Sequence, residues 1–179
     1  MKIFVASDIH GSKYYAQKVV DSFYKENADL LVLLGDIYNH GPRNPLPREY
    51  APMEVADILN KMTDKLIVIQ GNCDSEVDQM ISDFTFVKDS LIFVDGLRVF
   101  ATHGHVWNKD NIPPNCGDVL VYGHFHTAFI EEVGGVVVAN PSSASLPKDD
   151  TRGYLTIEKN AITLKNLENN TIIEKGIIK

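Results

Sequence analysis

The sequence predicts an α/β fold in which two β-sheets pack face to face with helices outside them. In the first half of the 179-residue chain, short apolar runs alternate with segments of helical periodicity. That alternation is typical of parallel strands joined by right-handed crossovers. In the second half, short β-like segments follow one another, separated by turns rich in glycine, aspartate and asparagine. No linker or repeat is visible, so residues 1–179 are expected to form a single domain.

Three strands and two helices are expected in the first half. Residues 2–6 form a short β-rich run that ends at a polar turn, and residues 29–34 and 66–69 are apolar on both faces, as in buried strands. Residues 12–25 and 53–62 carry apolar side chains at helical spacing.

The rest of the chain is expected to form one long loop and a series of short strands. The stretch 37–52 holds four prolines, which favours a loop. Segments 133–136 and 158–161 look like hairpin tips. The strands are expected at about residues 84–88, 91–94, 97–102, 118–122, 127–132, 135–139, 153–158, 161–166 and 171–178.

Composition excludes several classes of protein. A net charge of −7 argues against coating of polymeric nucleic acid, which needs a basic face. No apolar run approaches the roughly 20 residues that span a bilayer, and the N-terminus does not resemble a signal peptide, so we expect a cytoplasmic protein without a membrane partner. The two cysteines, Cys73 and Cys116, are too few for a disulfide framework, and as free thiols they are expected to be inert rather than redox-active.

Ionisable and amide side chains gather directly after the predicted strands. Because ligands of α/β sheets bind beyond the carboxyl ends of the strands, side chains from five strands are expected at one edge. In chain order they are Asp8, His10, Asp36, Asn72, Asp74, His103, His105, His124 and His126.

This mixture of donors predicts a metal centre. Carboxylate and amide oxygens combined with imidazole nitrogens suit Mn, Fe or Zn better than Ca or Mg. Asp36 is the candidate bridge between two ions, which would activate a hydroxide and clamp a phosphorus centre during in-line displacement. Other metal sites and a serine hydrolase are disfavoured, because paired cysteines, HExxH and GxSxG are all absent.

Five blocks resemble those of the calcineurin-like phosphoesterases, in the order of that family and over most of the chain. The segments 39–44 and 71–80 resemble the small YfcE-type bacterial phosphodiesterases in particular. The blocks are Asp8-Ile9-His10-Gly11, Gly35-Asp36, Gly71-Asn72-Cys73-Asp74, Thr102-His103-Gly104-His105 and Gly123-His124-Phe125-His126.

The resemblance implies a two-sheet sandwich in four layers, α/β/β/α, and a dinuclear centre. One ion would be held by Asp8, His10, Asp36 and His126, and the other by Asp36, Asn72, His103 and His124. Manganese is the expected metal, with iron, zinc, nickel or magnesium as alternatives. His105 would orient the ligands, and a homo-oligomer is plausible for this subgroup.

Two features bear on the substrate. Two divalent ions, two carboxylates and a hydroxide sum to a charge of about +1, which suits a singly charged phosphate diester better than a dianionic monoester. Many relatives carry histidine where this chain has Cys73, and a thiol is a poorer general acid. We therefore expect either that good leaving groups are favoured or that the leaving oxygen is protonated through water. The catalytic candidates are Asn72, Cys73, Asp74 and His105, and the substrate-contact candidates are His40 and Arg43.

The prediction is therefore a hydrolase of small phosphate diesters that acts through a metal-activated hydroxide. Two alternatives stay open. The same fold serves as a protein-interaction scaffold in a retromer subunit, although this sequence retains His10 and the other ligand positions. A metal-dependent nuclease would need a groove with clustered Lys and Arg, and the sequence offers none.

Overall fold

The computed structural model describes residues 1–178, which form two β-sheets and a small set of helices. The helices are α1 (Lys13–Lys25), α2 (Pro52–Leu59), a 3₁₀ segment η1 (Asn60–Lys65) and α3 (Glu76–Met80). The strands are β1 (Lys2–Ala6), β2 (Leu30–Leu33), β3 (Leu66–Ile69), β4 (Phe86–Val87), β5 (Asp89–Val94), β6 (Leu97–Thr102), β7 (Val119–Val121), β8 (Ala128–Val133), β9 (Val136–Pro141), β10 (Gly153–Glu158), β11 (Ala161–Asn166) and β12 (Ile172–Ile177).

Both sheets contain parallel and antiparallel strands. The seven-stranded sheet has the order β12-β11-β10-β1-β2-β3-β4, in which β1 to β4 are parallel and β10 to β12 are antiparallel. The five-stranded sheet has the order β5-β6-β7-β9-β8, with β6, β7 and β9 parallel. The hairpins predicted at 133–136 and 158–161 connect β8 to β9 and β10 to β11, as expected.

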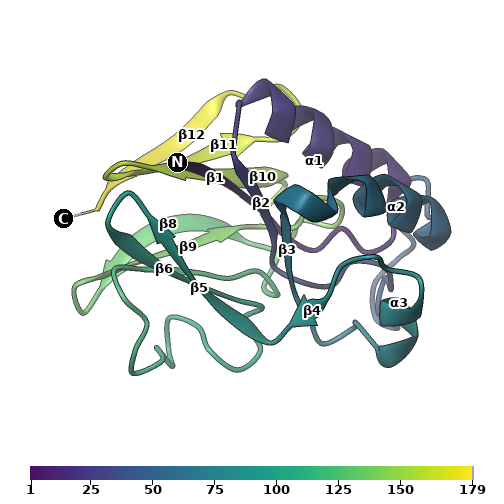
Figure 1. The fold of residues 1–179 in the computed structure, drawn as a ribbon, viewed down its shortest axis with the longest axis horizontal. Helices are drawn as coiled ribbons and strands as arrows, with labels where there is room; N and C mark the ends of the chain where they lie inside the picture. The colour runs from purple at the N-terminus through teal and green to yellow at the C-terminus, as the bar shows by residue number, and fades with distance from the viewer. Residues whose placement is uncertain (179) are drawn as a thin grey trace.

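The predicted face-to-face packing of two sheets is confirmed. Figure 1 shows one sheet above the other, and a single apolar cluster fills the space between them, with members such as Val5 and Leu155 from the larger sheet and Val99 and Val121 from the smaller. Burial of this apolar surface is the main force that holds the sheets together.

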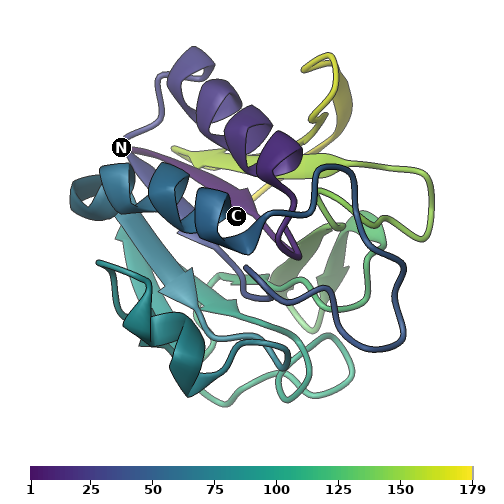
Figure 2. The ribbon, with the colours of Figure 1, turned by 90° about the vertical axis from the view of Figure 1, so that its right-hand side faces the viewer.

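The helices α1 and α2 cover the outer face of the seven-stranded sheet. Figure 2 shows α1 and α2 side by side on that face, where a second apolar cluster lies beneath them. The helix α1 begins after Ser12, whose hydroxyl accepts a hydrogen bond from the Tyr15 amide, and its apolar stripe faces the sheet, as with Val19 and Phe23.

The fourth layer differs from the α/β/β/α arrangement that the resemblance implies. Among residues 1–178, no helix follows Met80, so no helical element covers the outer face of the five-stranded sheet. That face is instead covered by the segment that connects β6 to β7, where Ile112 and Cys116 pack on Tyr122 and Val138. The connection is too rich in Gly, Pro and Asn to form a helix.

Two other details depart from expectation. The helix α3 was not expected, because its five residues bury no apolar stripe. The helix α2 ends at Leu59 and continues as the 3₁₀ segment η1 beyond the predicted end at residue 62. No helix in the described part of the chain has the length and apolar character needed to cross a bilayer.

Candidate metal centre

The polar turns after β1, β2, β3, β6 and β7 meet at one edge of the sandwich, as the sequence predicts. They bring the predicted metal ligands together in two adjacent groups. The first contains Asp8, His10 and His126, and the second contains Asn72, His103 and His124, with Asp36 between them.

The first group is closely packed and buried. His10 Nε2 lies 3.2 Å from His126 Nε2, and Asp8 Oδ1 lies 3.5 Å and 3.1 Å from these two nitrogens. All three side chains are at most 6% exposed. Three donors that converge in so small a volume form the geometry of a metal-binding site.

The second group converges in the same way around His103. The Nε2 atom of His103 lies 3.0 Å from Asn72 Oδ1 and 3.3 Å from His124 Nδ1. Asp36 joins the groups, because its Oδ2 lies 3.8 Å from His10 Nε2 and its Oδ1 lies 3.5 Å from His103 Nε2. A carboxylate so placed is able to bridge two ions.

Backbone carbonyls fix the orientation of three imidazoles. The Nδ1 atoms of His10, His103 and His126 lie 2.7, 2.7 and 2.6 Å from the carbonyl oxygens of Asn39, Leu34 and Leu146. A hydrogen bond to a carbonyl requires the proton on Nδ1, which leaves the Nε2 lone pair directed into the site. Metal-binding histidines are commonly held in this way, so the donor set fits a pair of divalent ions.

The pKa values reflect the electrostatics of the metal-free protein. Burial opposes ionisation of Asp8, but the imidazoles of His10 and His126 outweigh it and hold the pKa of this carboxyl well below its usual value. Burial likewise disfavours the imidazolium of His10, yet the nearby Asp8 carboxylate raises its pKa. For His124, burial and the neighbouring His103 lower the pKa, which favours a neutral imidazole able to bind a metal.

Left-handed backbone conformations present five of these ligands. Asp8, His10, Asp36, His124 and His126 have φ between 51° and 63°, a region that non-glycine residues seldom adopt. Such strain persists only where the surrounding structure enforces it, and it often marks a functional site.

Gly71 is required by the close packing of the turns. A Cβ atom at this position would lie 2.1 Å from Asp36 Oδ1 and 2.4 Å from the Asp36 amide nitrogen. Any side chain at residue 71 would therefore displace the Asp36 carboxylate.

Asp74, a predicted catalytic residue, lies behind the metal ligands. Its carboxylate accepts hydrogen bonds from the amides of Asp36, Ile37 and Gly71 at 2.7–2.8 Å. Burial, together with the charge of Asp36, raises the pKa of Asp74 to about 6 despite these donors. The structure thus places Asp74 where it fastens the turn after β2 to the turn after β3.

Cys73 lies at the cavity beside Asp36. Its amide donates to Asp36 Oδ1 at 2.8 Å, and burial together with the Asp36 carboxylate raises the pKa of the thiol to about 12. His105 is exposed and is not among the residues that line the main cavity. Its ring centroid lies 5.4 Å from that of His103, and it lines a neighbouring cavity with Trp107 and Lys88.

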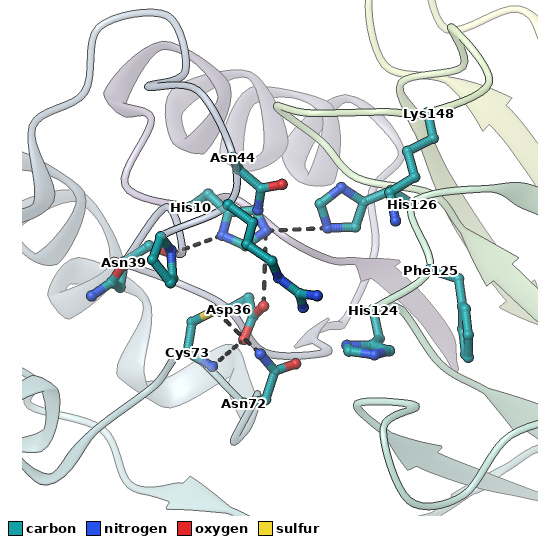
Figure 3. Close-up of a pocket in the computed structure, with 12 residues that line it drawn as sticks. His10, Asp36, Asn39, Asn44, Asn72, Cys73, His124, Phe125, His126 and Lys148 are labelled. Carbon is teal, nitrogen blue, oxygen red and sulfur yellow. Dashed lines mark hydrogen bonds and ion pairs between the residues drawn. The ribbon is translucent and has the colours of Figure 1, made fainter.

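A cavity of about 780 Å³ opens over the two groups of ligands (Figure 3). Arg43 lines it, as predicted for a substrate contact, but His40 does not; the His40 ring packs edge-on against Tyr50, with centroids 5.3 Å apart. The full lining is His10, Asp36, Asn39, Pro42, Arg43, Asn44, Asn72, Cys73, His124, Phe125, His126 and Lys148.

Sequence reasoning missed five of these residues as site components, and Pro42 is one of them. Asn39 and Asn44 belong to the proline-rich loop, and their spacing around Arg43 was a usable signal. Phe125 stands between two predicted ligands in the sequence, and this position was also a usable signal. Lys148 follows β9 and reaches the site only through the fold, since its amide donates to the carbonyl of His126 at 2.8 Å.

Known proteins share both the sequence and the fold. Residues 1–161 match the family model described as the calcineurin-like phosphoesterase superfamily domain. The chain is 42% identical to phosphodiesterase YfcE of Escherichia coli K12 over 99% of this chain and 98% of that protein. It is 28% identical to phosphodiesterase MJ0936 of Methanocaldococcus jannaschii, over 87% of each chain.

The solved structures agree with these matches. The structure of E. coli YfcE superposes with a TM-score of 0.95 at 39% identity, with full coverage of both chains. Vps29 of Entamoeba histolytica, solved with zinc, superposes with a TM-score of 0.65 at 18% identity over the whole of both chains, which shows a shared fold. With its ligand groups, its two sheets and these matches, this chain belongs to the calcineurin-like phosphoesterase superfamily.

Proposed function

We propose that this protein hydrolyses small phosphate diesters at a dinuclear metal centre. The observation that carries the proposal is the pair of converging donor groups joined by Asp36. The full-length similarity to phosphodiesterase YfcE supports diesters as the substrate class.

Asp8, His10, Asp36 and His126 would hold one ion, and Asp36, Asn72, His103 and His124 the other. Bound divalent ions lower the pKa of water and neutralise charge on a phosphate. We propose manganese as the native metal, as the resemblance to the YfcE-type phosphodiesterases implies. The mixed oxygen and imidazole donors do not exclude iron, zinc, nickel or magnesium, which are the alternatives to compare.

The chain's own residues would position the substrate. Arg43 and Lys148 line the cavity and, within residues 1–178, neither forms an ion pair, so both are available to a phosphate oxygen. Asn39 and Asn44 add amide groups at the same wall. Asp74 would act as a positioning residue, because it holds the backbone that carries Asp36 and Asn72.

The size and charge of the site favour a small substrate. A volume of about 780 Å³ is typical of a pocket for a small molecule, and a net charge of −7 disfavours a polyanion. A scaffold related to Vps29 is the second candidate, since that protein shares the fold. A complete ligand set with oriented imidazoles favours the enzyme.

The test is metal-restored hydrolysis. Protein stripped with a chelator is assayed with bis(p-nitrophenyl) phosphate and with p-nitrophenyl phosphate, each with Mn, Mg, Zn or no metal. We expect Mn to restore cleavage of the diester in preference to the monoester. Asp36→Asn should lower kcat by at least about a hundredfold, because it weakens the shared ligand of both ions. If folded, metal-loaded protein cleaves neither ester, the scaffold is the better explanation.

A further inference from the structure

Phe125 is an exposed aromatic side chain in a cavity that is lined mostly by polar residues. It is 41% exposed and lines the same cavity as the metal ligands. In sequence it stands between His124 of one donor group and His126 of the other. Catalysis by metal ions has no need of a phenyl ring at this position, so the ring calls for a separate explanation.

The backbone around Phe125 is tightly folded. His124 and His126 both have left-handed φ values, 63° and 60°, and the Phe125 amide donates to the carbonyl of Gly123 at 2.7 Å. This turn directs the two imidazoles into the site and leaves the intervening side chain at its rim. Figure 3 shows Phe125 next to His124, across the site from Asn39 and Cys73.

Neighbouring rings fix the orientation of the phenyl group. Phe125 meets His124 nearly edge-on, with centroids 5.1 Å apart and planes at 83°, and it meets Tyr122 at 5.9 Å and 75°. Tyr122 is itself buried and packs against Phe129 at 5.9 Å. A ring held in this way has little conformational freedom to lose when a ligand packs on it.

We propose that Phe125 is the wall of a subsite for a flat aromatic substituent of the phosphate ester, such as an aryl group or a nucleobase. This inference rests on the proposed function and narrows its substrate class. Because the Phe125 ring lies 5.1 Å from the ring of His124 and lines the same cavity, it is available to the organic group of a phosphate ester held at the candidate ligands. Stacking of a planar group on an oriented aromatic ring is favourable, whereas a methyl group gains little there.

The test compares the binding of two ligands by calorimetry in the presence of Mn. The ligands are the methyl monoesters of phenylphosphonic and methylphosphonic acid, which are both monoanions and differ only in the group on the P–C bond. We expect the wild-type protein to bind the phenyl compound about tenfold more tightly. That preference should fall severalfold in Phe125→Ala and Phe125→Leu, and Phe125→Trp should retain it.

Two controls separate this role from a structural one. Phe93→Ala removes another exposed phenylalanine, on β5 and outside the cavity, and should leave the preference unchanged. The methyl compound should bind Phe125→Ala as tightly as it binds the wild type. Equal loss of both ligands in Phe125→Ala, or an unchanged preference, would overturn the subsite. Failure of both ligands to bind the wild type would instead count against the proposed function.

Discussion

At the scale of single residues, the cations at the rim of the cavity are the most direct means of testing substrate recognition. Arg43 is exposed and lines the site, and Arg48, only five positions later, stacks on Tyr14 at 3.5 Å outside the cavity. The two arginines therefore form a matched pair in one loop. They differ in their access to a phosphate bound in the cavity.

We expect Arg43→Met to lower kcat/KM for a diester by about tenfold, because an exposed charge-assisted hydrogen bond to phosphate is lost. Arg48→Met should change kcat/KM by less than about twofold. Steady-state kinetics at several ionic strengths measure both variants. Equal effects of the two substitutions would mean that Arg43 acts only through the general field of the loop.

Cys73 bears on the leaving group. Its thiol lines the cavity beside Asp36, where many relatives have histidine. An imidazolium is a better proton donor at neutral pH than a thiol. We expect Cys73→His to raise kcat at least about tenfold more for an alkyl diester than for an aryl diester, whose leaving group needs little protonation. Parallel assays of the two substrates check this, and equal gains would show that Cys73 does not limit leaving-group protonation.

At the scale of elements, the sequence predicts those site residues that directly follow a strand. A short apolar run followed by Asp, Asn or His fixes both the strand and the edge at which its ligand lies, and so Asp36 and His103 could be placed from sequence. The direction of a side chain within a turn could not be placed. Phe125 depends on left-handed conformations at both neighbours, and Lys148 depends on which strand lies beside β7.

The proline-rich loop, residues 37–52, also has features that the sequence could not predict. Its irregularity was predictable, but its attachment was not: Ser12 Oγ donates to the carbonyl of Arg48 at 2.5 Å, and Ala51 donates to the carbonyl of Gly11 at 2.8 Å. These long-range bonds, and not the loop's composition, hold Arg43 at the cavity while His40 packs on Tyr50.

Ser12 therefore serves two elements, since it caps α1 and anchors the loop. We expect Ser12→Ala to lower the free energy of unfolding by about 1–2 kcal/mol, from loss of the cap and of a buried hydrogen bond. It should also raise KM severalfold with little change in bound metal. Ser75→Ala is the control, because Ser75 precedes α3 and bonds only to Asp78 with its hydroxyl; KM should not change. If KM does not change in Ser12→Ala, the remaining hydrogen bonds between the loop and the turn after β1 are sufficient to hold the loop in place.

At the scale of the whole molecule, the candidate metal centre draws its residues from both sheets. Asp8, Asp36 and Asn72 follow strands of the larger sheet, and His103 and His124 follow strands of the smaller. The relative position of the sheets thus determines the distances at the site, and the apolar cluster between them determines that position. We propose on this basis that residues 1–179 form one cooperative domain, as the sequence predicts.

Two probes on opposite sides of the sandwich test this. The helices lie on the seven-stranded sheet and give the far-ultraviolet circular dichroism at 222 nm, whereas the single tryptophan, Trp107, follows β6 of the other sheet. We expect the two urea transitions to coincide, as they do for a two-state domain. Leu155→Ala truncates a fully buried side chain between the sheets. It should lower the free energy of unfolding reported by both probes by about 2–5 kcal/mol. Ile173→Ala, on the exposed edge strand β12, should change the free energy of unfolding by no more than about 0.5 kcal/mol with either probe. If Leu155→Ala separated the two curves, the sheets would be independent units, and the metal centre would form only after they dock.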